Sequence, residues 1–339
     1  MRYKPMSADF QINNYAVWGA SMAVKQKSLN RTLALKPIVF AKECEKKLAE
    51  LLMEADKACA TVGERIMHDM VIGVDGPIPD HSYFYNNLEF YENGAAFFEL
   101  WSYIPGRMPA GFTPDLKAKN AMYDVAQIVD GNGNPKELIQ ISHVLVYKNA
   151  AIVEATKGTG GAFLVEKYLN KLLRERCAKR PPHIGFTTAI SSDLLNEILQ
   201  GGGAVSVSLG MVGAKQESDN KVVGLLSDAH SVFSKTELVT LSWSAGSKST
   251  LSAEEVVTEA RTAKDDNLDK IFIKLKHGSI KGLSKYRITS PIVVRDAGGR
   301  NPDHKEVKDA MIDYLGRLLQ PDAKGRRMLD DEGNLINNG

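Results

Sequence analysis

The sequence has few cysteines, no long apolar run and little net charge, and each shortage excludes a class of protein. Cys44, Cys59 and Cys177 are odd in number and far apart, which argues against a disulfide framework and a thiolate zinc site. No apolar stretch approaches the roughly 20 residues that a membrane-spanning helix needs. The first thirty residues also lack the compact apolar core of a signal peptide. We therefore expect a cytoplasmic protein with no membrane span.

The net charge of +2 over 339 residues is too small to attract a polyanion to the chain as a whole. Any such attraction must come from local clustering. Residues 261–300 provide it, with ten Lys or Arg against four Asp or Glu, a local balance of +6. This cluster indicates a polyanion partner, with nucleic acid the first choice.

We interpret Lys270–His277 and Lys285–Arg295 as two strands that carry cations on one face and apolar residues on the other. Cations on a sheet face can meet successive phosphates and release counterions. An ordinary solvated face, with lysines that discourage edge pairing, is the alternative. The candidate nucleic-acid-binding residues of this region are Lys270, Lys274, Lys276, Lys281, Lys285, Arg287, Arg295 and Arg300.

A second cationic group lies near a predicted helix over residues 162–177. Lys167, Lys171 and Arg174 are spaced i, i+4 and i+7, which places them on one helix face. Cations near a helix C-terminus are also favoured by the helix dipole alone. The candidates from this group are Lys171, Arg174, Lys179 and Arg180.

The order of predicted elements indicates an α+β fold with two domains, each a mixed or antiparallel sheet with packed helices. We predict an N-terminal α+β domain over residues 1–180, a C-terminal α+β domain with the basic strand pair over 181–322, and a polar tail over 323–339 with no core to join. Apolar spacing predicts a helix from Pro37 to about Ala60. A hairpin is predicted over residues 83–104, with its turn at Asn93-Gly94.

No motif of catalysis or cofactor binding is complete. The segment ATKGTGGAF opens a helix, where amides can hold phosphate, but it lacks the Lys-Ser/Thr of a Walker loop and favours a simple connection. His68-Asp69 and Asp80-His81 come closest to a metal pair, and each is more typical of a loop or turn. We therefore assign no catalytic residue, metal or cofactor, and expect a protein that is not an enzyme.

A metal-dependent nuclease is the enzymatic alternative. Glu154 and Lys157 lie near a strand end, with Asp115 upstream. The spacing E-x-x-K places the two side chains on opposite faces of a strand, which does not suit a shared site.

A third hypothesis is a protein-interaction or assembly subunit that uses the aromatic hairpin. Aromatic residues at these positions are more typical of a core than of an interface. They are Phe84, Tyr85, Phe90, Tyr91, Phe97, Phe98 and Trp101.

Two segments, ISHVLVYKNAAIVEATKGTGGAFLVEKYLNKLL and DKIFIKLKHGSIKGLSKYRITSPIVVRDAGG, resemble the RexA-type phage-exclusion proteins and related defence proteins. The first is similar to the family's paired strands and following helix, and the second to its D-I-x-I-K-x-K strand with a following strand. The resemblance implies a dimeric, largely sequence-nonspecific DNA-binding protein in anti-phage defence, with a second defence protein as a further partner. It carries over to Lys274 and Lys276, and the first 110 residues have no clear match.

Overall fold

The computed structural model describes residues 27–74, 76–107, 110–111, 124–125, 128–134, 136–154, 161–212, 221–232, 236–262, 270–321 and 325–336. Within these residues helices pack on antiparallel sheets, so the predicted α+β class is confirmed. None of the helices in these ranges is long and apolar enough to cross a membrane.

The larger sheet contains nine strands within the described residues. Their bounds are β1 (Ser28–Phe40), β2 (Met67–Gly73), β3 (Gly76–Phe90), β4 (Ala95–Tyr103), β7 (Ile139–Tyr147), β8 (Ala150–Glu154), β9 (Ile184–Phe186), β14 (Thr289–Gly298) and β15 (Asn301–Pro302). They lie in the order β15-β14-β1-β8-β7-β4-β3-β2, and β9 pairs with β1 beyond the end of β8. The short pair β5 (Ala110–Gly111) and β6 (Asp124–Val125) is separate.

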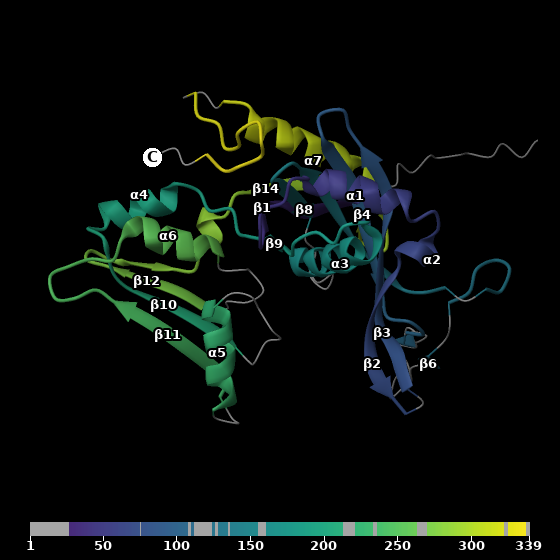
Figure 1. Ribbon diagram of the computed structural model, residues 1–339, viewed down its shortest axis with the longest axis horizontal. Coiled ribbons are helices and arrows are strands. Elements are labelled where there is room, and N and C mark those ends of the chain that lie inside the picture. Colours follow the sequence, from purple (N-terminus) through teal and green to yellow (C-terminus); the bar gives the residue numbers. More distant parts are fainter. Residues whose placement is uncertain are drawn as a thin grey trace, which may run out of the picture.

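Helices cover both faces of the larger sheet. On one face, α1 (Leu48–Lys57) and α3 (Gly161–Arg176) enclose a core that includes Tyr85, Phe98 and Val144, and α2 (Val62–Arg65) lies nearby. On the other face, α7 (His304–Leu319) packs on Phe97 and Leu145. Neighbouring residues of β4 and β7 thus supply both cores, because successive side chains of a strand point to opposite faces. Figure 1 shows this layered body, with α7 on the far side of the sheet from α3.

The smaller sheet has helices on one face. Its strands are β10 (Ala204–Val212), β11 (Leu238–Ser244), β12 (Lys270–Leu275) and β13 (Ser279–Lys281), in the order β11-β10-β12-β13. They pack with α4 (Asp193–Gln200), α5 (Lys221–Ser231) and α6 (Ala253–Thr262) around one core that includes Leu209 and Ile273. This sheet and its helices lie together at the left of Figure 1.

The predicted helix from Pro37 to Ala60 is wrong in its first part. Residues 28–40 form β1, and the helix begins only at Leu48. Leu35 donates its N–H to the Ile288 carbonyl, but Pro37 lies past the end of the β14 ladder at Ala34. The N–H that proline lacks is therefore not needed for a ladder bond.

The second basic strand is also placed differently from the prediction. Residues 284–286 form the 3-10 helix η1 (Ser284–Tyr286), and the strand that follows, β14, pairs with β1 of the larger sheet. The partners of β12 are β10 and β13. Strand pairing joins β14 to the larger sheet, and core packing joins α7 to it. The division into domains at residue 181 stays a prediction.

The tail does have a core to join, contrary to the prediction. Leu329 is buried against α7, and Met328 and Leu335 pack on the same cluster. Residues 330–334 form a turn, as their sequence DDEGN favours, and the Asp330 carboxylate accepts a hydrogen bond from the N–H of Asn334. The Glu332 carbonyl accepts a hydrogen bond from the N–H of Asn149. Three apolar side chains in an otherwise polar stretch are enough to dock it.

Several other predictions are confirmed. β3 and β4 form the hairpin, with Gly94 at a φ of +81° in its turn. The helix predicted over 162–177 is α3. Asp115, Lys157 and most of the loop between β8 and α3 lie outside the described residues.

Candidate functional site

Among the residues that the structure describes, the helices of the smaller sheet all pack on one of its faces, and we call the opposite face the open face. It consists of the side chains that alternate with the core positions of its four strands. Since directly paired residues share a face, strand register assigns its members. Its members with described side chains, besides Gly210, are Ser206, Ser208, Leu238, Thr240, Ser242, Ser244, Lys270, Phe272, Lys274, Ser279 and Lys281.

The alternation in KIFIKL explains why the lysines face solvent. Ile273 and Leu275 are buried in the core, so the intervening Lys274 must point to the other face. Lys270, Lys274 and Lys281 are all exposed, and Phe272 between them is half-buried. The strand therefore builds a cationic surface as a direct result of burying its apolar residues.

The open face carries positive charge alone. Among the described residues of the four strands, no Asp or Glu occupies an open-face position. Lys270, Lys274 and Lys281 make no ion pair within the described ranges, so their ammonium groups remain available. Apart from Phe272 and Leu238, the other described side chains of this face are Ser and Thr. The hydroxyl groups of Ser208 and Ser242 lie 2.8 Å apart across β10 and β11.

The other predicted residues of this region lie off the open face or are already paired. Lys276 follows the end of β12 and donates its backbone N–H to Gly203. Lys285 in η1 forms an ion pair of 2.9 Å with Glu197 of α4. Arg287 follows η1 and bridges to Ile190 through its backbone. The structure therefore brings only Lys270, Lys274 and Lys281 of this set together on one surface.

Arg295 and Arg300 belong to the larger body. The Arg295 guanidinium pairs with Asp303 and Glu306 at the start of α7. Arg300 is exposed, has a positive φ of 67°, and accepts a hydrogen bond from Arg31 at its carbonyl. These two cations therefore belong to the larger sheet and its connections, whereas β12 belongs to the smaller sheet.

The α3 cations divide into a paired set and an exposed one. Lys167 and Lys171 contact the Asp69 carboxylate at 2.5 and 2.6 Å, and Tyr83 donates its hydroxyl to the same group. Burial raises the pKa of Asp69, but these hydrogen bonds outweigh it and lower that pKa to about 2. Lys171 therefore has a structural role, while Arg174 at the end of α3 is exposed.

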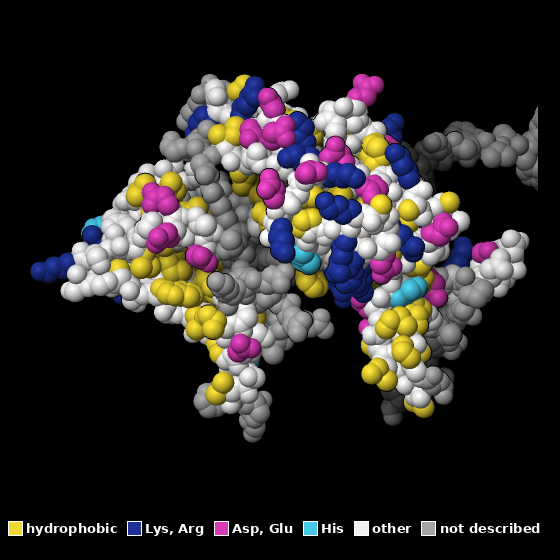
Figure 2. Space-filling model, in the orientation of Figure 1, with side chains coloured by type: hydrophobic (Ala, Val, Ile, Leu, Met, Phe, Trp, Pro, Cys, Tyr) yellow, Lys and Arg dark blue, Asp and Glu magenta, His cyan; other side chains and the backbone are white. Residues whose placement is uncertain are grey.

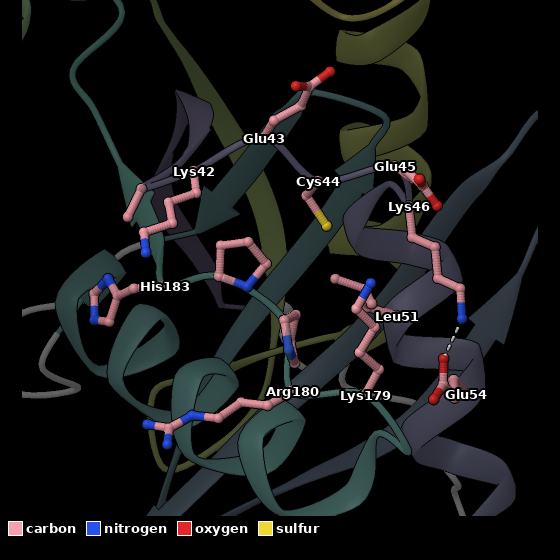
Figure 3. A pocket seen from close by; sticks show the side chains of 13 residues that line it. Lys42, Glu43, Cys44, Glu45, Lys46, Leu51, Glu54, Lys179, Arg180 and His183 are labelled. Carbon is pink, nitrogen blue, oxygen red and sulfur yellow. Dashed lines mark hydrogen bonds and ion pairs between the residues drawn. The ribbon is translucent and has the colours of Figure 1, made fainter.

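Lys179 and Arg180 line a pocket of about 730 Å³ between the start of α1 and the end of α3 (Figure 3). Figure 2 shows Lys and Arg side chains over this part of the body. Acidic groups are interspersed, and the Lys46 ammonium pairs with Glu54 at 2.5 Å. The lining carries four cations and three carboxylates, so its formal charge is only +1: Lys42, Lys46, Lys179, Arg180, Glu43, Glu45 and Glu54.

Most hairpin aromatics are core residues, as the sequence indicated. Tyr85, Phe97 and Phe98 are almost fully buried, and Phe84 and Trp101 contact each other with ring centroids 5.8 Å apart. The exposed apolar residues lie instead at the far end of the neighbouring hairpin, where Ile72 and Val74 are more than nine-tenths exposed. This end extends from the body in Figure 1.

A buried row of acidic and imidazole groups was missed from the sequence. Glu99, His143 and Glu154 are direct neighbours across β4, β7 and β8, and His304 of α7 completes the group. No local spacing signals this row, because its members are 11 to 205 residues apart. Of these four residues, sequence reasoning singled out only Glu154, and for a different partner.

A scan against protein-family models and a search of curated proteins both found no match to this chain. The resemblance to phage-exclusion proteins therefore stays a prediction. The open face, with like charges and no Asp or Glu at its described strand positions, is the surface from which we argue function.

Proposed function

We propose that the protein binds nucleic acid, DNA before RNA, through the open face of the smaller sheet. The observation that supports this most is an uncovered sheet face with three unpaired lysines and no described carboxylate. Like charges held together on a surface gain free energy when they displace the counterions of a polyanion. The pocket at Lys179, with a formal charge of only +1, offers a polyanion less electrostatic attraction.

The spacing of the lysines suits a phosphate backbone. Lys270 and Lys274 are four residues apart on β12, which is roughly 13 Å at about 3.3 Å per residue. That span corresponds to roughly four nucleotides of a B-form strand. Lys281 lies on the adjacent strand opposite Phe272, so the third charge falls between the other two along the sheet.

The remaining open-face groups fit contacts that do not read sequence. Serine and threonine hydroxyls can bind phosphate oxygens, and Phe272 offers a ring on which an unpaired base can stack. Neither group distinguishes one base from another. Binding is therefore expected to be largely independent of sequence.

Fluorescence anisotropy with random-sequence duplex and single-stranded DNA tests this proposal. Three phosphate contacts predict a loss of affinity of roughly 40-fold between 50 and 200 mM salt. The triple variant Lys270→Ala, Lys274→Ala, Lys281→Ala should bind weakly and lose most of this salt dependence. Phe272→Ala should weaken single-stranded binding more than duplex binding.

Lys285→Ala is the matched control, since it removes a nearby lysine that is already paired with Glu197. It should bind DNA like the wild type. Wild-type affinity in the triple variant would contradict the proposal. Loss of intact DNA in the presence of magnesium would favour the nuclease alternative instead.

The biological setting is part of the same proposal. The resemblance to phage-exclusion proteins supports a cytoplasmic role in anti-phage defence and a homodimer as the working form. The exposed apolar end of the β2–β3 hairpin supports self-association or contact with a second protein, because such residues are costly to leave in water (Figure 2). A mass in light scattering at the monomer value of 37.2 kDa across micromolar concentrations would contradict the dimer.

A further inference from the structure

The buried row on the α7-facing side of the larger sheet collects metal-ligand groups from four separate elements. Register places Glu99 opposite His143, and His143 opposite Glu154. α7 brings His304 to the same place, because Asp303 caps the helix by accepting the N–H groups of Lys305 and Glu306. The arrangement is therefore fixed by strand pairing and a helix cap, both rigid features.

The donor atoms of Glu99, His143 and His304 already converge. Nε2 of His143 lies 2.8 Å from Nδ1 of His304, and that Nδ1 lies 3.2 Å from Oε1 of Glu99. All three donor atoms lie within 4.8 Å of one another. Ligand atoms of a tetrahedral zinc ion, at about 2.0–2.1 Å from the metal, are roughly 3.3 Å apart. The two separations of 2.8 and 3.2 Å are within about half an ångström of that value, so a small rearrangement of these side chains would admit an ion.

Neighbouring groups orient these ligands. Nδ1 of His143 lies 3.1 Å from the Glu154 carboxylate, which accepts a hydrogen bond from the N–H at that position. The lone pair of the other ring nitrogen, Nε2, is then directed at His304. Glu99 accepts hydrogen bonds from Trp101 at 2.7 Å and Asn87 at 2.9 Å. In metal sites, a ligating imidazole usually donates its second N–H to a carboxylate. A ligating carboxylate usually accepts hydrogen bonds from neighbouring groups.

The charge of the row also favours a cation. Glu99 and Glu154 are 1% and 0% exposed, and Arg31, at 3.1 Å from Glu154, supplies the one fixed positive charge that contacts them within the described residues. With neutral imidazoles the group carries a formal charge of −1. A buried, uncompensated negative charge is unfavourable, so the row favours a bound cation.

We propose that Glu99, His143 and His304 bind a divalent first-row transition metal, with zinc the first to test. Two imidazoles and one carboxylate suit zinc and leave a fourth position open. The side chain of His304 is 41% exposed, which gives an ion a route from solvent. Glu154 acts as a positioning residue through His143.

Zinc and cobalt binding to the full-length, chelator-treated protein tests this site. The wild type should bind a single zinc ion per chain, show visible absorption bands with cobalt, and melt at a higher temperature with zinc than without. His304→Ala and Glu99→Gln should each weaken zinc binding at least 10-fold. Glu154→Gln should weaken it roughly 10- to 100-fold, as expected for an outer contact.

His277→Ala is the matched control, because His277 is an exposed histidine in the smaller sheet's turn. It should bind zinc like the wild type. His304 is chosen over the fully buried His143 so that the variant retains its fold, which melting without metal checks. Wild-type protein that binds no zinc, or variants that bind it unchanged, would overturn the proposal.

Discussion

The two sheets of this protein differ in how many of their faces are covered. In the larger sheet, Phe97 and Phe98 are adjacent in sequence and both are buried, each in a different core. In the smaller sheet, Ile273 is buried while its neighbour Lys274 is exposed. The same alternation of side chains thus gives apolar runs in one sheet and an apolar–cationic pattern in the other. Coverage by helices decides which surface remains for a ligand.

The difference also separates two kinds of lysine. Lys171 of the body is held by Asp69 and Tyr83, whereas Lys274 of the open face has no described carboxylate near it. Charge count in the sequence treats the two alike. Their partners show that only the second kind is free to exchange counterions for a polyanion.

The strongest test of this contrast places a lysine on each sheet. Ile152→Lys introduces a charge into the fully covered face under α7, and should cost about 4 kcal/mol or more of unfolding free energy. Ser242→Lys adds the same charge to the open face and should change stability by less than about 0.5 kcal/mol. Thermal and urea unfolding measure both. Equal melting temperatures for the two variants would break the comparison.

A second test concerns how the α7 face is closed. Leu329→Ala removes a side chain that is 1% exposed and should destabilise the protein by about 2–4 kcal/mol, because a cavity remains beside α7. Ile336→Ala, at a partly exposed site on the same segment, is the control and should cost well under half of that. Urea denaturation of both variants gives the measurement. A Leu329→Ala protein as stable as the control would show that the tail adds no cover.

The smallest expected effect concerns the paired lysines of the body. Since the pKa of Asp69 is lowered to about 2, its contribution to stability is present above the ordinary pKa near 4 and is lost as pH falls towards 2. After allowance for solvent screening, Asp69→Asn should cost about 1 kcal/mol at pH 7. That difference from the wild type should shrink in urea titrations between pH 5 and pH 2.5. A stability difference between Asp69→Asn and the wild type that does not depend on pH would argue against the ion pairs. DNA binding by Asp69→Asn should equal that of the wild type at pH 7.

The local sequence was sufficient to predict an element and its buried side where that element packs on a single core. The apolar stripe of α3 and the alternation in β12 predicted both elements and their buried sides. Only the end of β1, residues 37–40, was mistaken for the start of a helix, and this is where the strand passes from β8 to β9. A change of partner strand is a tertiary event and leaves no periodic signal.

The candidate sites differ in the same way. Lys270, Lys274 and Lys281 lie within 12 residues and could be proposed from alternation alone. Lys285 and Arg287 could not be excluded from the sequence, since only the structure shows that η1 interrupts the second strand. Glu99, His143 and His304 come together through one strand ladder and a helix, so no pattern of local spacing could have joined them.

The order of the elements along the chain has a consequence for biosynthesis. The face of the larger sheet that ends under α7 is made from strands completed by Glu154, but α7 begins only at His304. At about 5–20 residues per second, a ribosome needs roughly 8–30 s to make the intervening segment. During that interval Leu33, Phe97, Leu145 and Ile152 have no helix to cover them. The nascent chain should therefore be a client for chaperones until α7 leaves the exit tunnel.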